Sequence, residues 1–309
     1  MTEQTAGTTP SGSVSSADGV NDPRGIRAEP MGGPLGARIH GVDLSQPLSV
    51  ADFRVIEAAL HRHCFIMFPG QSLTATQFHA FSKHWGRAEP HVIDTFHHPE
   101  IADILVLSNV EKDGKPTGLK DAGTYFHSDY SYLDVPARCT MLYALQMPEA
   151  GNGTTFANQS RAYDDLSDSI KARLEGLVAR HHYGNRDDLD ESSRTVASVL
   201  NEAQKKKVHW VRHAIARRHP HVGRKSLYAV SGSSFGVEGM TDAEGVALLD
   251  QLKAHATQAK YLYTVDYKVG DVIVWDNAQL LHAAPLPQHD QARTLWRITV
   301  KEDPSVALR

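Results

Sequence analysis

The chain contains little cysteine and no long hydrophobic run. Only two cysteines occur among 309 residues, Cys64 and Cys139, and both lie in apolar, strand-like stretches. They predict buried thiols in a reducing compartment and no disulfide framework. No apolar run approaches the ~18 residues that a membrane span needs. The first twenty residues also lack the basic-then-apolar order of a signal peptide. These absences predict a cytoplasmic protein that contacts no membrane.

Neither sign of charge is in large excess. The chain has 32 Lys and Arg residues against 36 Asp and Glu residues, which gives a net charge of −4. Such a balance provides no basic surface for nucleic acid. We therefore expect a small-molecule ligand and no nucleic-acid partner, and we also expect a homo-oligomer, either a dimer or a tetramer.

Composition divides the chain into a tail and a globular part. Residues 1–25 are poor in large apolar side chains and predict a disordered N-terminal tail. Residues 26–309 predict a single domain, and we find no internal repeat in them. Within this domain, residues 184–207 are polar and mixed in charge. That segment is either a lid over the active site or a solvated surface insertion.

Short apolar runs separated by Gly and Pro dominate the globular part. Three Ser/Thr-x-x-Asp/Gln/Glu patterns predict helix starts at Ser49, Thr74 and Thr241. Many short strands with few helices indicate a mainly β core with flanking helices. The strand candidates are 64–68, 104–107, 125–132, 139–145, 178–183, 226–230, 261–267, 272–275 and 294–300.

The run Phe126-His127-Ser128-Asp129 is the first sign of chemistry. In a strand, side chains two residues apart lie on the same face, so His127 and Asp129 are expected to point the same way. With a histidine from elsewhere they would form a 2-His-1-carboxylate triad, the ligand set of non-haem Fe(II) oxygenases. A His-x-Asp pair alone is common by chance, so the remaining motifs decide its meaning.

Further motifs lie at defined spacings along the rest of the chain. A histidine, His282, is followed by arginines after eleven and fifteen residues, at Arg293 and Arg297. The other motifs are Gly41-Val42-Asp43-Leu44, Gly151-Asn152-Gly153-Thr154, Gly223-Arg224-Lys225, Val237-Glu238-Gly239 and Trp275-Asp276-Asn277. Together with the His-x-Asp pair they resemble the taurine dioxygenase and 2,4-dichlorophenoxyacetate dioxygenase (TauD/TfdA-like) family of Fe(II)/2-oxoglutarate-dependent dioxygenases, and the resemblance extends from about Gly36 to Val300.

The resemblance implies a fold, a reaction and a set of binding residues. The fold is a double-stranded β-helix, the jelly-roll core of cupin-like proteins. The reaction uses Fe(II), 2-oxoglutarate and O2, releases succinate and CO2, and hydroxylates a C–H bond of the substrate. His127, Asp129 and His282 would bind the metal, because they match the family's ligand positions. Arg293 and Thr154 would bind the remote carboxylate of 2-oxoglutarate.

For the substrate, the resemblance implies a small organic anion: a carboxylate, a sulfonate or a sulfate ester. Arg297 would hold its acid group, while His91 and Tyr125 would line the pocket. Where a taurine-specific site would need an amide, Gly123 and Tyr125 precede the metal motif. That difference favours a larger aryloxy or alkyl substrate. An amino-acid-like substrate of secondary metabolism is the alternative.

Other interpretations of the same residues stay open. Asp276 and Asn277 would either orient the metal ligands or satisfy a local turn. A metal-dependent, non-oxidative cupin-type enzyme could use the same triad without needing Arg293. A non-catalytic sensor would need neither turnover nor substrate. Of the 18 histidines, we expect these to lie on the surface: His97, His98, His181, His182, His219 and His221.

Overall fold

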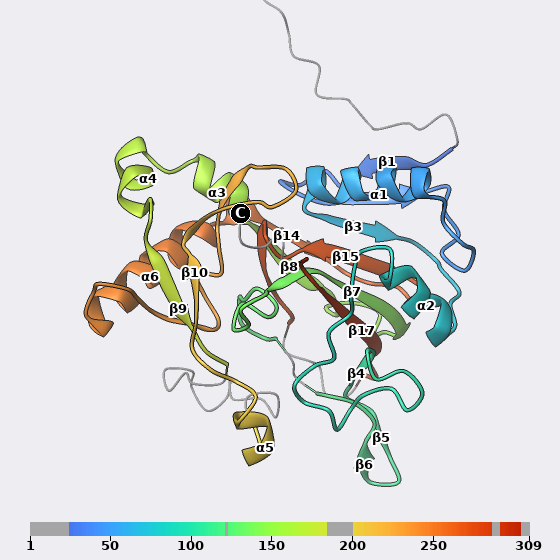
Figure 1. Ribbon diagram of the computed structural model, residues 1–309. Coiled ribbons are helices and arrows are strands. Elements are labelled where there is room, and N and C mark those ends of the chain that lie inside the picture. Colours follow the sequence, from blue (N-terminus) through green and yellow to red (C-terminus); the bar gives the residue numbers. More distant parts are fainter. Residues whose placement is uncertain (1–24, 121–122, 184–199, 286–290, 304–309) are drawn as a thin grey trace, which may run out of the picture.

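The computed structural model describes residues 25–120, 123–183, 200–285 and 291–303 (Figure 1). The helices are α1 (Val50–His63), α2 (Ala75–Ser82), α3 (Gln159–Asp164), α4 (Asp168–Leu174), α5 (Glu202–Lys205), α6 (Asp242–Ala256) and the 3-10 helix η2 (Ala259–Tyr261). The strands are β1 (Arg27–Pro30), β2 (Ala37–His40), β3 (Phe65–Phe68), β4 (Leu105–Ser108), β5 (Glu111–Lys112), β6 (Lys115–Pro116), β7 (Ala137–Gln146), β8 (Thr154–Asn158), β9 (Val178–His181), β10 (Val211–Ala214), β11 (Ala216–Arg218), β12 (Lys225–Leu227), β13 (Ser234–Val237), β14 (Leu262–Val265), β15 (Val272–Asp276), β16 (Leu280–Ala283) and β17 (Thr294–Lys301).

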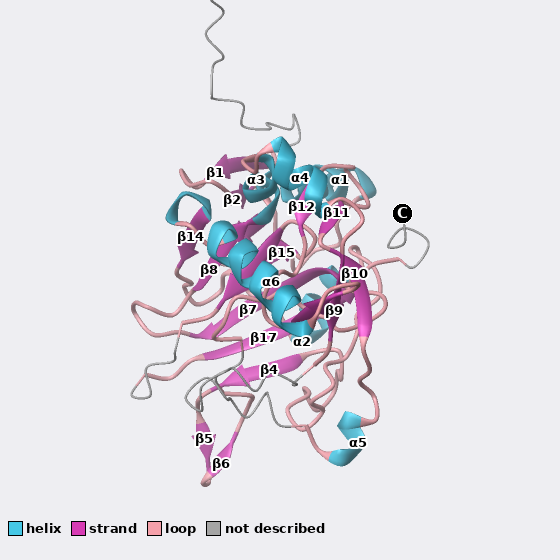
Figure 2. Cartoon of the chain, turned by 90° about the vertical axis from the view of Figure 1, so that its left-hand side faces the viewer, coloured by secondary structure: helices cyan, strands magenta, loops and turns pink. Residues whose placement is uncertain are grey.

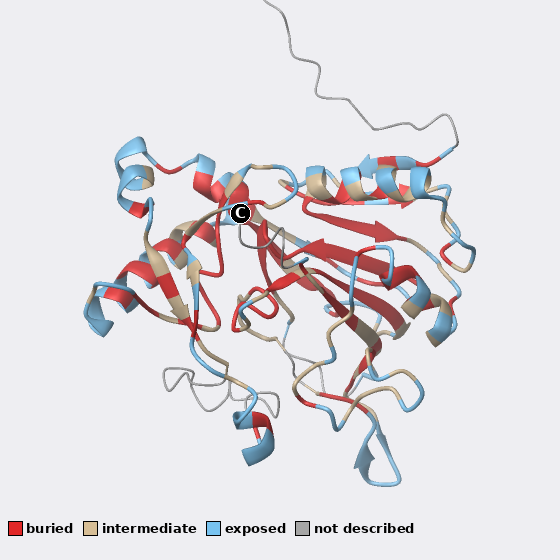
Figure 3. Cartoon of the chain, viewed as in Figure 1, coloured by how far each residue is buried: buried red, intermediate tan, exposed pale blue. Residues whose placement is uncertain are grey.

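A seven-stranded sheet with the order β1-β2-β3-β15-β7-β17-β4 forms the larger half of the core. Its central strands are buried on both faces, as Figure 3 shows. This explains why β3 and β15 are continuous apolar runs instead of alternating ones. Alternate residues still point to opposite faces of the sheet. Phe68, Val272 and Tyr143 are direct neighbours across three strands, and all three point to the face that packs against α1 and α2.

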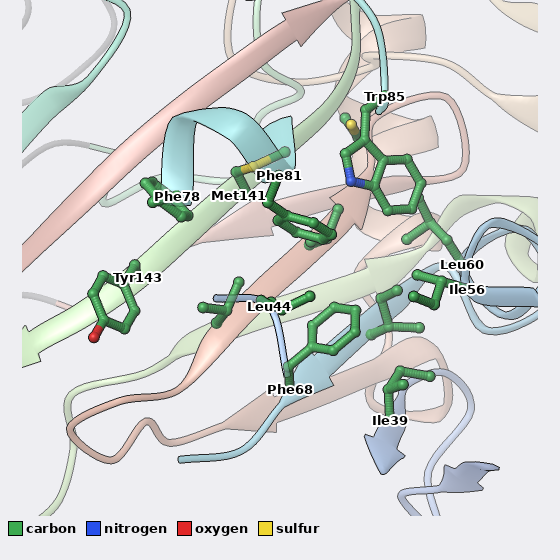
Figure 4. Close-up of a cluster of buried hydrophobic side chains, with 14 of the residues drawn as sticks. Ile39, Leu44, Ile56, Leu60, Phe68, Phe78, Phe81, Trp85, Met141 and Tyr143 are labelled. Carbon is green, nitrogen blue, oxygen red and sulfur yellow. The ribbon is translucent and has the colours of Figure 1, made fainter. Parts of the chain in front are cut away.

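Helices α1 and α2 cover the outer face of this sheet (Figure 4). Ile56 and Leu60 of α1 lie one turn apart, and Phe78 and Phe81 of α2 are spaced similarly, so each helix buries one apolar stripe. Both helices begin where the sequence predicts. Ser49 caps α1 by accepting from the Asp52 N–H.

The inner face of the larger sheet packs against a three-stranded sheet with the order β14-β8-β16. Phe65 and Trp275 of the larger sheet share one apolar cluster with Phe156 and Leu280 of the smaller one. The Phe65 and Phe156 rings stack at 4.6 Å between centroids. The two facing sheets form the predicted jelly-roll core, and the space between them holds the candidate site.

Helices α3 and α6 cover the outer face of the smaller sheet, and α6 crosses it in Figure 2. Leu249 and Leu252 of α6 share an apolar cluster with Ala157 and Leu281 of the sheet. Thr241 begins α6 with the predicted capping box, in which Thr241 and Glu244 each satisfy the other's backbone N–H. The core is therefore four layers deep, with sheets inside and helices outside.

One predicted strand is wrong. Residues 125–132 form no strand: His127 makes a single bridge, and turns follow it. Tyr130 has a φ of 52°, which no strand allows. The predicted tail lies outside the described residues except for Gly25, and the predicted lid lies outside them except for 200–207, which contain α5.

Candidate metal centre and anion site

A two-sided backbone bridge brings two distant histidines together. His127 and His282 each donate a backbone N–H to the other's carbonyl, at 3.0 and 2.9 Å. Residues that are directly opposed in this way hold their side chains on the same face. The two imidazole rings therefore lie close together, with their centroids 4.2 Å apart.

Asp129 approaches the same point from the turn that follows His127. Its Oδ1 lies 3.6 Å from His127 Nε2, and its Oδ2 lies 3.5 Å from His282 Nε2. Only 4% of the carboxylate side chain is exposed. One ligand atom from each of the three residues lies within 4.8 Å of the other two. The structure thus assembles the predicted triad, through a bridge and a turn rather than through a strand face.

The three side chains fit a divalent metal ion. His127 Nδ1 donates to the Tyr125 carbonyl at 2.8 Å, which leaves the Nε2 lone pair facing Asp129. Burial, together with the neighbouring His127, lowers the pKa of His282 to about 3, so its ring is neutral, as a metal ligand must be. Gly123 makes room for the site, since a Cβ there would lie 2.8 Å from His127 Cε1.

Three side chains hold the Asp129 carboxylate and its backbone. Thr140 Oγ1 donates to Oδ2 at 2.6 Å, and Arg297 donates to Oδ1 at 2.5 Å. Asn277 accepts the Asp129 backbone N–H at 3.2 Å and donates to Thr140 at 3.1 Å. Burial raises the pKa of Asp129, but Arg297 and the two imidazoles outweigh it and hold that pKa well below its usual value. Asp129 is therefore ionised and fixed in place.

Asp276, the neighbour of Asn277, belongs to a separate cluster. Its Oδ2 accepts from His219 Nε2 at 2.8 Å, and both side chains are buried. His61 completes a second group of three potential ligands within 4.8 Å. However, His219 Nδ1 accepts the backbone N–H groups of His221 and Val222. The proton must then sit on Nε2, which cannot bind a metal, so this cluster is a hydrogen-bonded support.

A second polar group lies where β8 begins. Thr154 is buried and points to the barrel interior, whereas Thr155 points outward and pairs with Thr264. The Tyr267 hydroxyl donates to Thr154 Oγ1 at 2.5 Å. Arg293 Nε donates to the Asn152 carbonyl at 3.1 Å, so the turn that precedes Thr154 also holds this arginine.

Arg293 has no acidic partner among the residues that the structure describes. Within the same residues, no hydrogen bond engages its two terminal nitrogens. Burial lowers the pKa of Arg293, because a cation loses hydration there. A buried guanidinium without a counter-charge is costly. Arg293 and Thr154 therefore form a candidate anion site, with a planar donor fork that suits a carboxylate.

Aromatic side chains lie near Arg297. The Tyr130 ring lies 5.8 Å from the guanidinium carbon. The His91 ring lies 6.2 Å from Tyr130 and 6.4 Å from Tyr183. Burial and the nearby Arg297 charge lower the pKa of His91 to about 3. The His91 ring is therefore neutral near pH 7 and lies close to Arg297. Tyr125 lies 5.3 Å from His127, at the edge of the same region.

The prediction for the surface histidines fails at two positions. His181 is 0% exposed and His219 is 3% exposed. Four further residues that contact the site were not predicted as site residues from the sequence: Asn109, Thr140, Asn152 and Tyr267. Of these, only Asn152 lies in a motif that carries the family resemblance, Gly151-Asn152-Gly153-Thr154.

Comparison with known proteins agrees with this geometry. Residues 27–299 match the family model described as taurine catabolism dioxygenase TauD, TfdA family. An alpha-ketoglutarate-dependent 2,4-dichlorophenoxyacetate dioxygenase from Cupriavidus pinatubonensis is 33% identical, over 90% of this chain and 98% of the relative. Pentalenolactone F synthase from Streptomyces arenae is 26% identical, over 89% of this chain and 95% of the relative.

A solved structure of the protein AAD-2, in complex with Mn(II) and N-oxalylglycine, has a TM-score of 0.74 and 28% identity. The likeness covers 90% of this chain and 98% of that one. Fold, site and relatives define an oxidoreductase, a 2-oxoglutarate-dependent dioxygenase that uses a metal and O2. The chain belongs to the TauD/TfdA family.

Proposed function

We propose that the metal is Fe(II), held by His127, Asp129 and His282, and that the enzyme hydroxylates a C–H bond of a small organic acid. The observation that carries this proposal is the pairing of a preformed 2-His-1-carboxylate group with a buried, uncompensated arginine. Neutral imidazole and carboxylate suit Fe(II), and three ligands on one side leave positions open for other molecules.

Different side chains bind the two organic acids, 2-oxoglutarate and the primary substrate. Arg293 and Thr154 bind the remote carboxylate of 2-oxoglutarate, since they offer free donors beside the core. Arg297, His91 and Tyr125 face the primary substrate. When bound, Fe(II), 2-oxoglutarate and O2 supply the oxidising chemistry, which yields succinate, CO2 and a hydroxylated substrate. The protein orients the reactants and excludes water.

We assign the substrate to aryloxy or alkyl acids. The aromatic rings near Arg297 provide an apolar surface next to a cationic group. This combination suits a molecule with a ring or chain at one end and a carboxylate, sulfonate or sulfate ester at the other. The dichlorophenoxyacetate relative supports the same class. The second candidate is an amino-acid-like substrate of secondary metabolism, and the pentalenolactone F synthase relative indicates that similar sequences are not confined to aryloxy acids.

A substrate screen tests the proposal. Purified protein with Fe(II), ascorbate, 2-oxoglutarate and O2 is offered aryloxy acids, alkyl sulfates, sulfonates, amino acids and lactone acids, and succinate release is measured. Substrate-dependent succinate supports a dioxygenase. Conversion that continues without O2 would instead identify a non-oxidative cupin-type enzyme.

Metal analysis tests the ligand assignment separately. His127→Ala and His282→Ala should each lose bound iron and turnover while the fold, measured by circular dichroism, is retained. His84→Ala is a matched control, because His84 is exposed and its ring stacks on Phe53 of α1, outside the candidate site. Wild-type iron content in either ligand variant would show that the triad is assigned wrongly.

The substrate's charge can be tested at Arg297. Neutral amides of the true substrate should be turned over poorly. Arg297→Leu should weaken binding of the acid much more than binding of the amide, since the amide never formed the charge pair. Equal losses for both would assign Arg297 a purely structural role.

Four expectations about the whole protein stay predictions. They are the tail at residues 1–25, the single domain at 26–309 with a lid at 184–207, the homo-oligomer and the cytoplasmic location. No helix in the described part of the chain is long and apolar enough to cross a membrane. Limited proteolysis with and without 2-oxoglutarate tests the tail and the lid. Light scattering and cell fractionation test the other two.

A further inference from the structure

We propose that Tyr267 is a positioning residue for the cosubstrate: its hydroxyl orients the Thr154 hydroxyl toward the remote carboxylate of 2-oxoglutarate. This inference rests on the proposed cosubstrate site at Arg293 and Thr154. It adds a residue to which neither motif nor spacing pointed, because Tyr267 lies in the connection between β14 and β15.

The hydrogen-bond direction is the first step. Tyr267 and Thr154 are both 3% exposed, and their hydroxyl oxygens are 2.5 Å apart with Tyr267 as the donor. A hydroxyl has one hydrogen to donate. Thr154 Oγ1 accepts from Tyr267, so its own hydrogen must point elsewhere. No acceptor for that hydrogen is found among the described residues, and a buried donor needs one.

The backbone keeps Tyr267 beside Thr154. Asn152 Oδ1 accepts the Tyr267 backbone N–H at 2.9 Å, and the Asn152 backbone N–H donates to Asp266 Oδ1 at 3.3 Å. Gly153 allows this contact, since a Cβ at that position would lie 1.6 Å from the Val265 carbonyl oxygen. Any side chain at Gly153 would push the two segments apart.

The same turn connects Tyr267 to Arg293. Asn152 binds Tyr267 through its side chain and Arg293 through its carbonyl. Asn152 thus fixes the position of Arg293 directly and that of Thr154 through Tyr267. Donation from Tyr267 also polarises the Thr154 hydroxyl, which strengthens its own hydrogen bond to an anion. Burial raises the pKa of Tyr267, so the phenol stays protonated and remains a donor.

The test measures dissociation constants on Mn(II)-loaded protein by calorimetry, without turnover. Two probes are compared: 2-oxoglutarate, and 2-oxopentanoate, which has a methyl group in place of the remote carboxylate. Tyr267→Phe should raise the Kd of 2-oxoglutarate about 2–13-fold, the equivalent of one neutral hydrogen bond. The Kd of 2-oxopentanoate should change less than about twofold, because it lacks the group that Thr154 binds.

A double-mutant cycle then asks whether Tyr267 acts through Thr154. In a Thr154→Val background, Tyr267→Phe should have almost no further effect on the Kd of 2-oxoglutarate. In a Thr154→Ser background, which keeps the hydroxyl, the full effect should return. Tyr263→Phe is the matched control: Tyr263 lies four residues earlier, and its hydroxyl donates to the Met31 carbonyl, away from Thr154.

Two kinds of failure can be distinguished. If Arg293→Ala binds 2-oxoglutarate as tightly as wild type, the cosubstrate site itself is assigned wrongly. If Arg293→Ala loses binding while Tyr267→Phe does not, only the role of Tyr267 is refuted. The role is also refuted if both probes lose affinity equally, or if the loss persists in the Thr154→Val background.

Discussion

Replacing Arg297 with leucine should destabilise the metal-free protein more than the metal-loaded protein. Arg297 donates to Asp129 at 2.5 Å, with 12% and 4% of the two side chains exposed. It is the one permanent cation in contact with Asp129 among the described residues, since His282 is neutral near pH 7. Leucine would leave the carboxylate buried and uncompensated.

The magnitude follows from the cost of breaking a buried ion pair. Removing one partner typically costs ~3–5 kcal/mol. At about 2 °C per kcal/mol for a chain of this size, Tm should fall by roughly 6–10 °C. A bound divalent metal supplies positive charge to Asp129, so the variant then loses only one charged hydrogen bond, ~1.5–3 kcal/mol. By linkage, the variant gains more stability from the metal than wild type does.

Thermal unfolding by circular dichroism measures this, with chelator-treated protein compared with Mn(II)-loaded protein. Without Arg297, burial raises the pKa of the Asp129 carboxyl in the variant. Protonation of Asp129 then removes the uncompensated buried charge. The deficit in the metal-free variant should therefore grow as pH rises from 5 to 8. Arg293→Leu is the matched control, since that arginine has no acidic partner within the described ranges. Equal Tm losses with and without metal would refute the reasoning.

Three further predictions test other parts of the site. Arg293→Ala should raise the KM for 2-oxoglutarate about 10–100-fold in steady-state assays, with a much smaller change for the primary substrate, because it removes a charge-assisted pair. Asn277→Ala should weaken metal binding about 10–100-fold in equilibrium dialysis, since Asn277 holds both Asp129 and Thr140; unchanged affinity would leave Asn277 with a turn role only. His181 is buried, neither of its ring nitrogens has a hydrogen-bond partner within the described ranges, and burial lowers its pKa to about 3. The contribution of the neutral ring to stability is therefore complete above pH 6.5 and is lost as pH falls toward 3. His181→Phe should recover up to ~2 kcal/mol at pH 5 relative to pH 7 in urea unfolding, and identical pH profiles would exclude His181 as a source of acid sensitivity.

The sequence predicted that His127 and Asp129 converge because they share one face of a strand, whereas in the structure they converge for a different geometric reason. The aromatic run at 125–132 favoured a strand by propensity. In the structure, the bridge to His282 and the left-handed backbone of Tyr130 replace the strand with a turn. Both arrangements bring a histidine and an aspartate together, so the three side chains converge although the predicted strand is wrong.

Residues that reach the site through sheet register could not be predicted. Thr140 lies within a ten-residue apolar strand, and it faces Asp129 only because β7 pairs with β15 and β17 in a particular register. Nothing in the sequence marks it. His219 follows the same logic: it precedes a proline in a turn, which indicates surface, but its partner Asp276 lies 57 residues away and draws it inside.

The two arginines differ in their counter-charges, and under the proposed roles this difference would couple metal binding to substrate binding. Arg293 has no counter-charge among the described residues, so its guanidinium would be open to an anion whether or not metal is present. Arg297 is paired with Asp129, so a substrate acid that binds Arg297 as proposed would have to compete with that carboxylate. Metal binding draws the Asp129 charge toward the cation and weakens its hold on Arg297. The affinity for an acidic substrate should therefore rise when the metal is bound, whereas the affinity of Arg293 for a remote carboxylate should depend on the metal much less.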